Sequence, residues 1–268
     1  MLPFARMIEY GNIVVESPKP KLLVQANYNN VLVQVGTDLY GFGVNNYGQL
    51  GAGDTLAKTT MVHVLSSVDR FFGGTNGSIA LTTDGRIMWT GRDACFPEAG
   101  GRATWFDASS IFASHGIYAN TIADIQIGWS VRLLTTSGDF YYTGANVSAE
   151  CGVPAGPINV LTKSTLSSIE KIRGSINGTH FIMRDGDAYF CGANEQGCAG
   201  LGVSTEIIST PTKVTDNVYD ISSIYQATQW IKTDGSIWYS GYGQYGQLST
   251  PGSKASTNTI TLNDAIPV

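Results

Sequence analysis

The stretch DGRIMWTG, residues 84–91, recurs along the chain as five related copies. Each copy has a turn, a short run of mostly apolar residues and a closing glycine. The closing glycines are 48, 53, 48 and 49 residues apart, and a fixed period of this length is typical of repeat architectures. The five copies are GTDLYGFG (36–43), DGRIMWTG (84–91), SGDFYYTG (137–144), DGDAYFCG (185–192) and DGSIWYSG (234–241), which end at Gly43, Gly91, Gly144, Gly192 and Gly241.

Each copy predicts a β-hairpin. Asp84-Gly85, Asp185-Gly186 and Asp234-Gly235 have the composition of two-residue hairpin turns, which need residues that tolerate positive φ. Gly36-Thr37 places the glycine first, as a type II′ turn requires. An apolar strand precedes each turn, for example residues 79–81, so the turn joins two strands.

The strand after each turn is apolar on both faces, as Ile87, Met88 and Trp89 illustrate. A sheet with one face in water would alternate polar and apolar residues, whereas sheets stacked around an axis bury both faces. The closing glycine suits a close approach of two backbones. With no segment of helical period, the sequence predicts an all-β propeller of five four-stranded blades over residues 22–268. Residues 1–21 would form an N-terminal arm or half-blade.

Composition narrows the classes of partner. Only 14% of residues are charged, the net charge is −5 and the pI is about 5.1, which argues against nucleic acid as a partner. No apolar run reaches the length of a membrane span, so we expect no membrane insertion, and no secretion signal is recognisable. The four cysteines are expected to be free and buried, although a Cys191–Cys198 disulfide stays open. They match no zinc spacing, so no metal is expected.

The loop after the first closing glycine, Asn45 to Gly53, resembles the N-x-x-G-Q-L-G phrase of the regulator-of-chromosome-condensation repeats. Weaker copies occupy residues 146–152 and 194–200, and the second repeat has lost the phrase. The resemblance covers roughly residues 22–268 and implies a propeller, usually of seven blades in that family. The family's strand histidine is matched at His180 alone. The signature residues that we interpret as structural are Gly48, Gln49, Leu50, Gly246, Gln247 and Leu248.

We expect no enzyme, because no nucleophile, base and oxyanion group occur in a catalytic pattern, and we expect no cofactor. The recurring Asp84, Asp185 and Asp234 are turn residues. One segment differs from the other repeats, namely the loop that follows Gly91, which is rich in aromatic residues. These aromatics either form a partner-binding surface or pack beneath their own loop. They are Phe96, Trp105, Phe106 and Phe112.

Propellers serve many functions, so the fold alone does not select one. The first hypothesis is a bacteriophage structural or attachment protein of the tail, a fibre or a decoration. It would contact virion components or a host surface, after synthesis in the host cytoplasm. The alternatives are a cytoplasmic partner-binding propeller, such as a small-GTPase regulator, and a propeller that inhibits an enzyme. All three bind proteins, and an oligomer is compatible with each.

Overall fold

The structure, a computed structural model, describes residues 8–9, 12–13, 21–27, 29–175, 177–204, 207–224, 226–243 and 257–263. Its strands form five four-stranded antiparallel sheets, each a meander of consecutive strands, and one separate hairpin. We number the sheets blades 1 to 5 in chain order. Blade 1 comprises β3 (Leu22–Ala26), β4 (Asn30–Val35), β5 (Asp38–Gly43) and β6 (Lys58–Leu65); blade 2 comprises β7 (Val68–Gly73), β8 (Gly77–Thr82), β9 (Ile87–Gly91) and β10 (Arg102–Asp107); blade 3 comprises β11 (Ile122–Ile127), β12 (Ser130–Thr135), β13 (Phe140–Gly144) and β14 (Ile158–Lys163); blade 4 comprises β15 (Ile169–Ser175), β16 (Gly178–Met183), β17 (Ala188–Ala193) and β18 (Ile207–Thr215); blade 5 comprises β19 (Val218–Ile224), β20 (Ala227–Lys232), β21 (Ile237–Gly241) and β22 (Thr257–Leu262).

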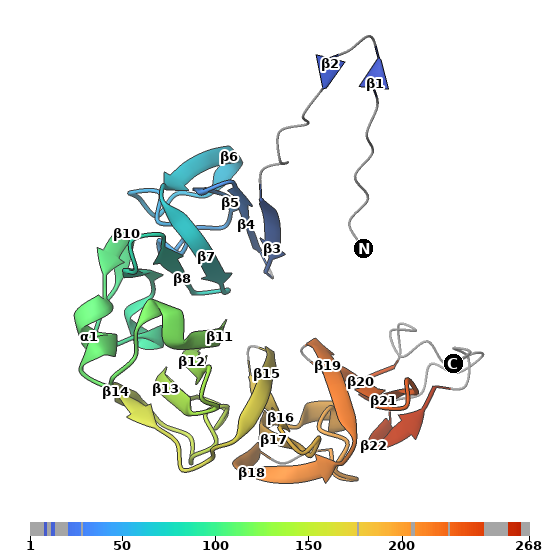
Figure 1. Cartoon of the computed structure of the whole chain (residues 1–268). Helices are drawn as coiled ribbons and strands as arrows, with labels where there is room; N and C mark the ends of the chain where they lie inside the picture. Colours follow the sequence, from blue (N-terminus) through green and yellow to red (C-terminus); the bar gives the residue numbers. More distant parts are fainter. Residues whose placement is uncertain are drawn as a thin grey trace.

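The blades follow one another around an arc, with blades 1 and 5 at its two ends (Figure 1). The first strand of each blade lies on the inside of the arc. There β3 packs near β7, β7 near β11, β11 near β15 and β15 near β19. The predicted all-β propeller of five four-stranded blades is confirmed. The short helix α1 (Ser109–Ala113) and the 3-10 helices η1 (Asp93–Cys95), η2 (Ala119–Thr121) and η3 (Glu195–Gly197) lie in connections.

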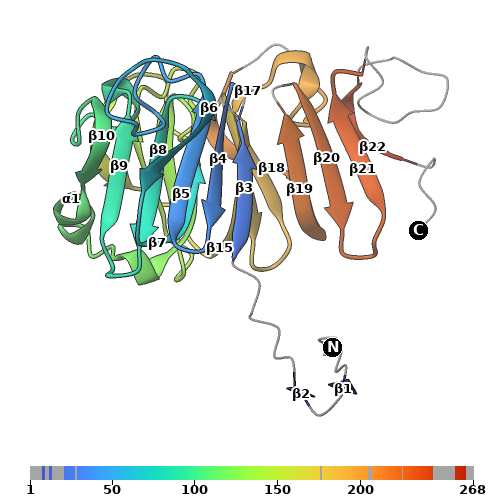
Figure 2. The same cartoon turned by 90° about the horizontal axis from the view of Figure 1, so that it is seen from above.

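The two ends of the strands carry different connections (Figure 2). One end, which we call the loop face, carries the loops between the third and fourth strands and the short turns between the first and second. The other end, the turn face, carries the Asp-Gly hairpins and the links between blades, including α1. The loop of blade 1 (residues 44–57) and that of blade 2 (residues 92–101) therefore lie at the same end of the molecule.

The core lies between the blades. Every residue of β8, β9, β12 and β13 is buried, so both faces of these strands are packed, as the sequence predicts. Across the interface of blades 3 and 4, Phe140 and Phe181 meet edge to face with ring centroids 5.0 Å apart. This edge-to-face geometry is favoured for aromatic pairs beyond the area that they bury.

The Asp-Gly hairpins are wider than predicted. The backbone N–H of Thr82 donates to Arg86 O at 3.0 Å, which encloses three residues rather than two. Gly85 has φ +86°, the left-handed conformation that ends a type I turn in a three-residue hairpin loop. The same spacing occurs in blades 3, 4 and 5. In blade 1 Val35 pairs with Asp38, so this hairpin has the predicted two-residue turn, and Gly36 has φ +63°.

The closing glycines lie where backbones nearly touch, as predicted. All five have positive φ, between +101° and +128°. A Cβ on Gly91 would lie 2.4 Å from the Cα of Gly77, and one on Gly192 would lie 2.4 Å from Asn177 O. A side chain at these positions would therefore clash with the turn between the first two strands of its own blade.

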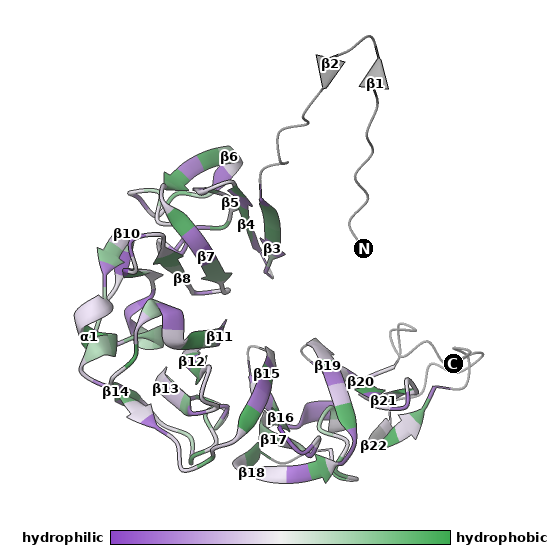
Figure 3. Cartoon of the chain, viewed as in Figure 1, coloured by the Kyte–Doolittle hydropathy of each residue, from purple (hydrophilic) through white to green (hydrophobic). Residues whose placement is uncertain are grey.

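Blade 1 leaves apolar side chains exposed on the face that no other blade covers. Leu22 and Val24 of β3 are 63% and 62% exposed, and Figure 3 shows β3 as a largely hydrophobic strand. Before it, β1 (Ile8–Glu9) and β2 (Asn12–Ile13) pair only with each other. The rest of the predicted arm or half-blade lies outside the described residues.

All four cysteines are free and buried, as expected, so the Cys191–Cys198 disulfide is not formed. Burial raises the pKa of the Cys95 thiol to about 12, which makes it a poor nucleophile. None of the helices in the described ranges is long and apolar enough to span a membrane.

Candidate functional site

Buried asparagines hold the loops of the loop face in shape. Asn45 accepts a hydrogen bond from Leu50 N at 2.9 Å and donates to Asp54 O at 2.7 Å. Asn146 and Asn194 bind their own loops in the same way, each accepting from the backbone N–H five residues ahead. All three side chains are fully or almost fully buried. A buried amide with both ends satisfied fixes the path of an irregular loop.

The same loops also fasten each blade to the next one. Ser78 Oγ donates to Gln49 O at 2.8 Å, and Thr179 Oγ1 donates to Glu150 O at 2.6 Å. Gln49 itself reaches Thr75 O of blade 2 at 3.1 Å. The Gln-Leu signature of blade 1 is therefore a structural device that joins neighbouring blades, with Leu50 fully buried in their core.

Gly48 belongs to the same device, because a Cβ there would lie 2.4 Å from the Cα of Ala103. The second copy of the signature, Gly246, Gln247 and Leu248, lies outside the described residues.

Blade 2 departs from this pattern at two consecutive positions. Asp93 stands two residues after the closing glycine, where blades 1, 3 and 4 have the asparagine. Its carboxylate is exposed and, among the described residues, accepts only from the adjacent Ala94 N, at 2.7 Å. Arg92 stands one residue after the glycine, where the other three loops have Val44, Ala145 and Ala193. This charge outlier in the repeat alignment is a signal that the sequence analysis missed.

The aromatic residues of this segment replace the missing asparagine clamp. Phe96 and Phe112 have no exposed surface, and Phe96 meets the rings of Trp89 and Phe112 edge on, at 5.5 and 5.4 Å. Trp105 and Phe106 are partly buried and pack against the cores on either side. Of the two interpretations of these aromatics, packing beneath their own loop describes Phe96 and Phe112.

An arginine in contact with two aromatic rings lies on the loop face near the buried Phe96 and Phe112. The guanidinium carbon of Arg92 is 4.8 Å from the ring centroid of Tyr47 and 4.9 Å from that of Trp129. Tyr47 belongs to the loop of blade 1, Arg92 directly follows β9, and Trp129 lies in the turn between β11 and β12. The stack thus brings together three successive blades, and Tyr47 is 42% exposed. Tyrosine, tryptophan and arginine are the residues that most often dominate the energy of protein interfaces.

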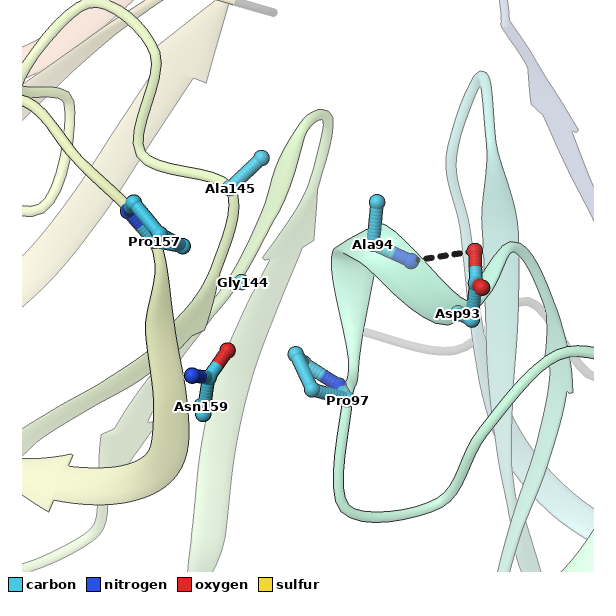
Figure 4. Close-up of a pocket in the computed structure, with 7 residues that line it drawn as sticks. All are labelled: Asp93, Ala94, Pro97, Gly144, Ala145, Pro157 and Asn159. Carbon is cyan, nitrogen blue, oxygen red and sulfur yellow. Dashed lines mark hydrogen bonds between the residues drawn. The ribbon is translucent and has the colours of Figure 1, made fainter.

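Two shallow cavities lie beside the loop of blade 2. One, of about 330 Å³, is lined by Tyr47, Arg92, Asp93 and Arg102, among others. The other, of about 360 Å³, separates the blade 2 loop from blade 3 and is drawn in Figure 4. In that view Asp93, Ala94 and Pro97 face Gly144, Ala145, Pro157 and Asn159 across the cavity. Asp93 lines both cavities.

The buried ionisable groups belong to interfaces between blades. Arg132 of β12 donates to Gly178 O at 2.8 Å and to Thr179 Oγ1 at 2.6 Å, both in blade 4. Glu150 accepts from Ser130 Oγ of its own blade at 2.6 Å, and its backbone carbonyl accepts from Thr179 Oγ1 of blade 4 at 2.6 Å. His180 is packed between Phe190 and Trp230, and this burial lowers its pKa to about 3.

None of these buried groups opens on either cavity described above. Among the described residues no group of three or more His, Cys, Asp or Glu side chains is placed to hold a metal ion.

Comparison with known proteins agrees with this architecture. No family model matches the chain. Over 80 residues, 27% of the chain, it is 40% identical to the human X-linked retinitis pigmentosa GTPase regulator, of which that match covers 8%. Among solved structures, Prp20p from Saccharomyces cerevisiae superposes with a TM-score of 0.71 over 91% of this chain and 63% of Prp20p, at 15% identity. Human WBSCR16 superposes with a TM-score of 0.70 over 90% of this chain and 67% of that protein, at 14% identity.

The chain thus spans about two thirds of the solved propellers that it matches and a small part of the human regulator. The structural likeness is a likeness of fold, since the identities are low. The sequence likeness, over 80 residues, is to the human GTPase regulator. In the structure, the four-stranded sheets, the closing glycines and the asparagine-clamped loops recur along the chain as the repeat predicts. The chain is a β-propeller built from repeats of the regulator-of-chromosome-condensation type.

Proposed function

We propose that this chain is a non-enzymatic propeller that binds a protein partner with its loop face, in the manner of small-GTPase regulators. The observation that carries the proposal is the stack of Tyr47, Arg92 and Trp129, which three blades build and two members of which line a shallow cavity. These three residue types are enriched at interface hot spots.

The relatives support a partner-binding role. The human relative is a GTPase regulator. Prp20p is described with its binding to Gsp1p and histones, and yeast RCC1 (Prp20) has been solved bound to Kap60. Histones are basic, and this chain with its net charge of −5 is compatible with a basic protein but not with a polyanion such as DNA.

These relatives favour the cytoplasmic partner-binding alternative over the bacteriophage hypothesis. None of the proteins named above is a virion component. A role in a tail, a fibre or host attachment has no support from them, so we do not carry it forward as the proposal.

The test is direct binding to purified small GTPases in their GDP-bound, GTP-analogue-bound and nucleotide-free forms, measured by biolayer interferometry. We expect at least one to bind with a Kd in the micromolar range or below. In parallel, a photo-crosslinking amino acid at position 47 should form a discrete adduct in a lysate of the cells in which the protein occurs naturally. The proposal fails if no GTPase binds and position 47 yields no adduct.

The matched control is Tyr118, which is 56% exposed and lies on the turn face beside the Asp84 hairpin. Tyr47→Ala should weaken partner binding at least about tenfold, as loss of a central interface aromatic does. Tyr118→Ala should leave binding unchanged. The opposite result would move the binding surface to the turn face.

A further inference from the structure

Arg92 differs from the other arginines in what its guanidinium contacts. Each of the other described arginines donates to a carboxylate or a carbonyl oxygen. Arg92 makes only its two ring contacts, with no side-chain hydrogen bond or ion pair to any described residue. The arginines with such partners are Arg70, Arg86, Arg102, Arg132, Arg173 and Arg184.

The two rings leave one part of this guanidinium available. The rings of Tyr47 and Trp129 lie 4.8 and 4.9 Å from the guanidinium carbon, a contact that arginine makes favourably with aromatic rings. The N–H donors lie in the plane of the group and point outward from its edge. A stacked guanidinium is also already ordered, so binding a ligand at its edge costs less side-chain entropy than binding at a free surface arginine.

The repeat shows that this arginine is not needed for the fold. Blades 1, 3 and 4 build the same position with Val44, Ala145 and Ala193 and keep the same strands. In blade 2 an arginine is held in place by rings from the two neighbouring blades, while the asparagine clamp beside it is lost. An ordered charge with unused donors points to a ligand that supplies the acceptors.

The cavity limits the chemistry of that ligand. Arg102 lines it as well. Its guanidinium lies 4.8 Å from the ring centroid of Phe106 and donates to the neighbouring Gly101 O at 3.3 Å. Two arginines at one cavity favour an anionic ligand. Asp93 lines the same cavity, so two arginines and one aspartate leave a single net positive charge there, which suits a ligand with one negative charge better than a polyanion. A single planar carboxylate fits these conditions, because it accepts two parallel hydrogen bonds from a guanidinium.

We propose that the Tyr47–Arg92–Trp129 stack is a carboxylate-recognition site that takes an Asp or Glu side chain of a protein partner. This inference rests on the proposed function and adds the chemistry by which the loop face recognises its partner. Arg92 supplies the bidentate hydrogen bonds, the two rings fix its plane, and Arg102 contributes a second positive charge at the rim.

The test uses a blocked tripeptide, acetyl-Gly-Glu-Gly-amide, and its Gln counterpart as matched probes. Side-chain Nε–Hε signals of arginine are followed by NMR in the full-length chain during each titration. We expect the Arg92 signal to shift with the Glu peptide and not with the Gln peptide. Arg92→Lys, which keeps the charge but loses the planar fork, should weaken Glu-peptide binding at least about tenfold.

The control variant is Arg86→Ala on the turn face, where the arginine is paired with Asp84 at 2.9 Å. It should leave peptide binding unchanged, and a preserved melting temperature in both variants excludes misfolding. No shift of the Arg92 signal at saturating Glu peptide would overturn the inference. A larger response to inorganic phosphate than to the peptide would overturn the carboxylate assignment and identify a phosphate site.

The two proposals fail separately. Peptide binding at Arg92 without any protein partner would leave the inference standing while the proposed function falls. A partner that binds the loop face equally well to wild type and Arg92→Lys would leave the function standing while the inference falls.

Discussion

Blades 2 and 4 anchor equivalent loops in different ways, one with an apolar ring and the other with a polar side chain. In blade 4 the buried amide of Asn194 accepts from Ala199 N at 2.8 Å and donates to Val203 O at 2.8 Å. In blade 2 the ring of Phe96 fills the space beneath the loop, without exposed surface. Both blades keep the closing glycine and the Asp-Gly hairpin. The comparison teaches that the strands of a repeat can be kept while a loop changes how it is anchored.

The change of anchor has a consequence at the surface. An asparagine clamp must be buried to work, so it occupies the residue two positions after the glycine. Once Phe96 anchors the blade 2 loop from below, that residue is free to be the exposed Asp93. The preceding residue is free to be Arg92, which neighbouring blades hold between two rings. Specialisation of one blade thus follows from loss of its polar clamp.

The largest expected effect concerns the apolar anchor. Phe96→Ala should lower the free energy of unfolding by about 3–5 kcal/mol, the usual cost of removing a fully buried phenylalanine. Denaturant unfolding followed by tryptophan fluorescence measures this. A loss below about 1 kcal/mol would mean that the loop of blade 2 is not anchored by this ring.

The next effect concerns His180 of blade 4, which occupies the strand position that Arg132 holds in blade 3. Burial lowers the pKa of His180 to about 3, whereas in the unfolded chain it is near 6.5. The unfolded state therefore binds a proton first as pH falls. His180 therefore does not lower the free energy of unfolding above pH 6.5. Between pH 6.5 and 3 it lowers that free energy by about 1.4 kcal/mol for each pH unit.

The measurement is urea unfolding at several pH values between 7 and 4, for wild type and His180→Leu. The difference between the two slopes isolates the histidine, since the carboxylates titrate in both proteins. Parallel slopes would contradict the burial of a neutral imidazole.

A smaller effect tests the polar clamp. Asn194→Ala leaves the buried Ala199 N–H and Val203 C=O without their partner, which should cost about 1–3 kcal/mol. Urea unfolding of the full chain gives the value. An unchanged stability would show that the clamp contributes nothing to closing its loop.

The smallest effect is expected at the equivalent position of blade 2. Asp93→Ala removes an exposed carboxylate that accepts only from its neighbour's N–H, so the change should stay within about 0.5 kcal/mol. Measured beside Asn194→Ala, it tests whether blade 2 has exchanged its clamp. Equal losses at the two positions would end the contrast between these blades.

The sequence by itself determined the repeat and, with it, the fold. Turn residues, apolar strands and a closing glycine are local features that recur with a constant period, so the blade count and the strand positions follow from pattern alone. The width of the Asp-Gly hairpins was predicted incorrectly. Asp-Gly serves both two-residue and three-residue loops, and only the pairing of Thr82 with Arg86 distinguishes them.

Only the tertiary structure decided where the candidate site lies. The sequence singled out the blade 2 segment, but an aromatic residue has the same composition signal whether it faces water or the core. Packing between blades buries Phe96 and Phe112 and brings Tyr47 and Trp129 against Arg92 from loops 82 residues apart in number. Contacts between neighbouring blades depend on how the sheets stack, and that geometry is a property of the whole propeller rather than of any single repeat.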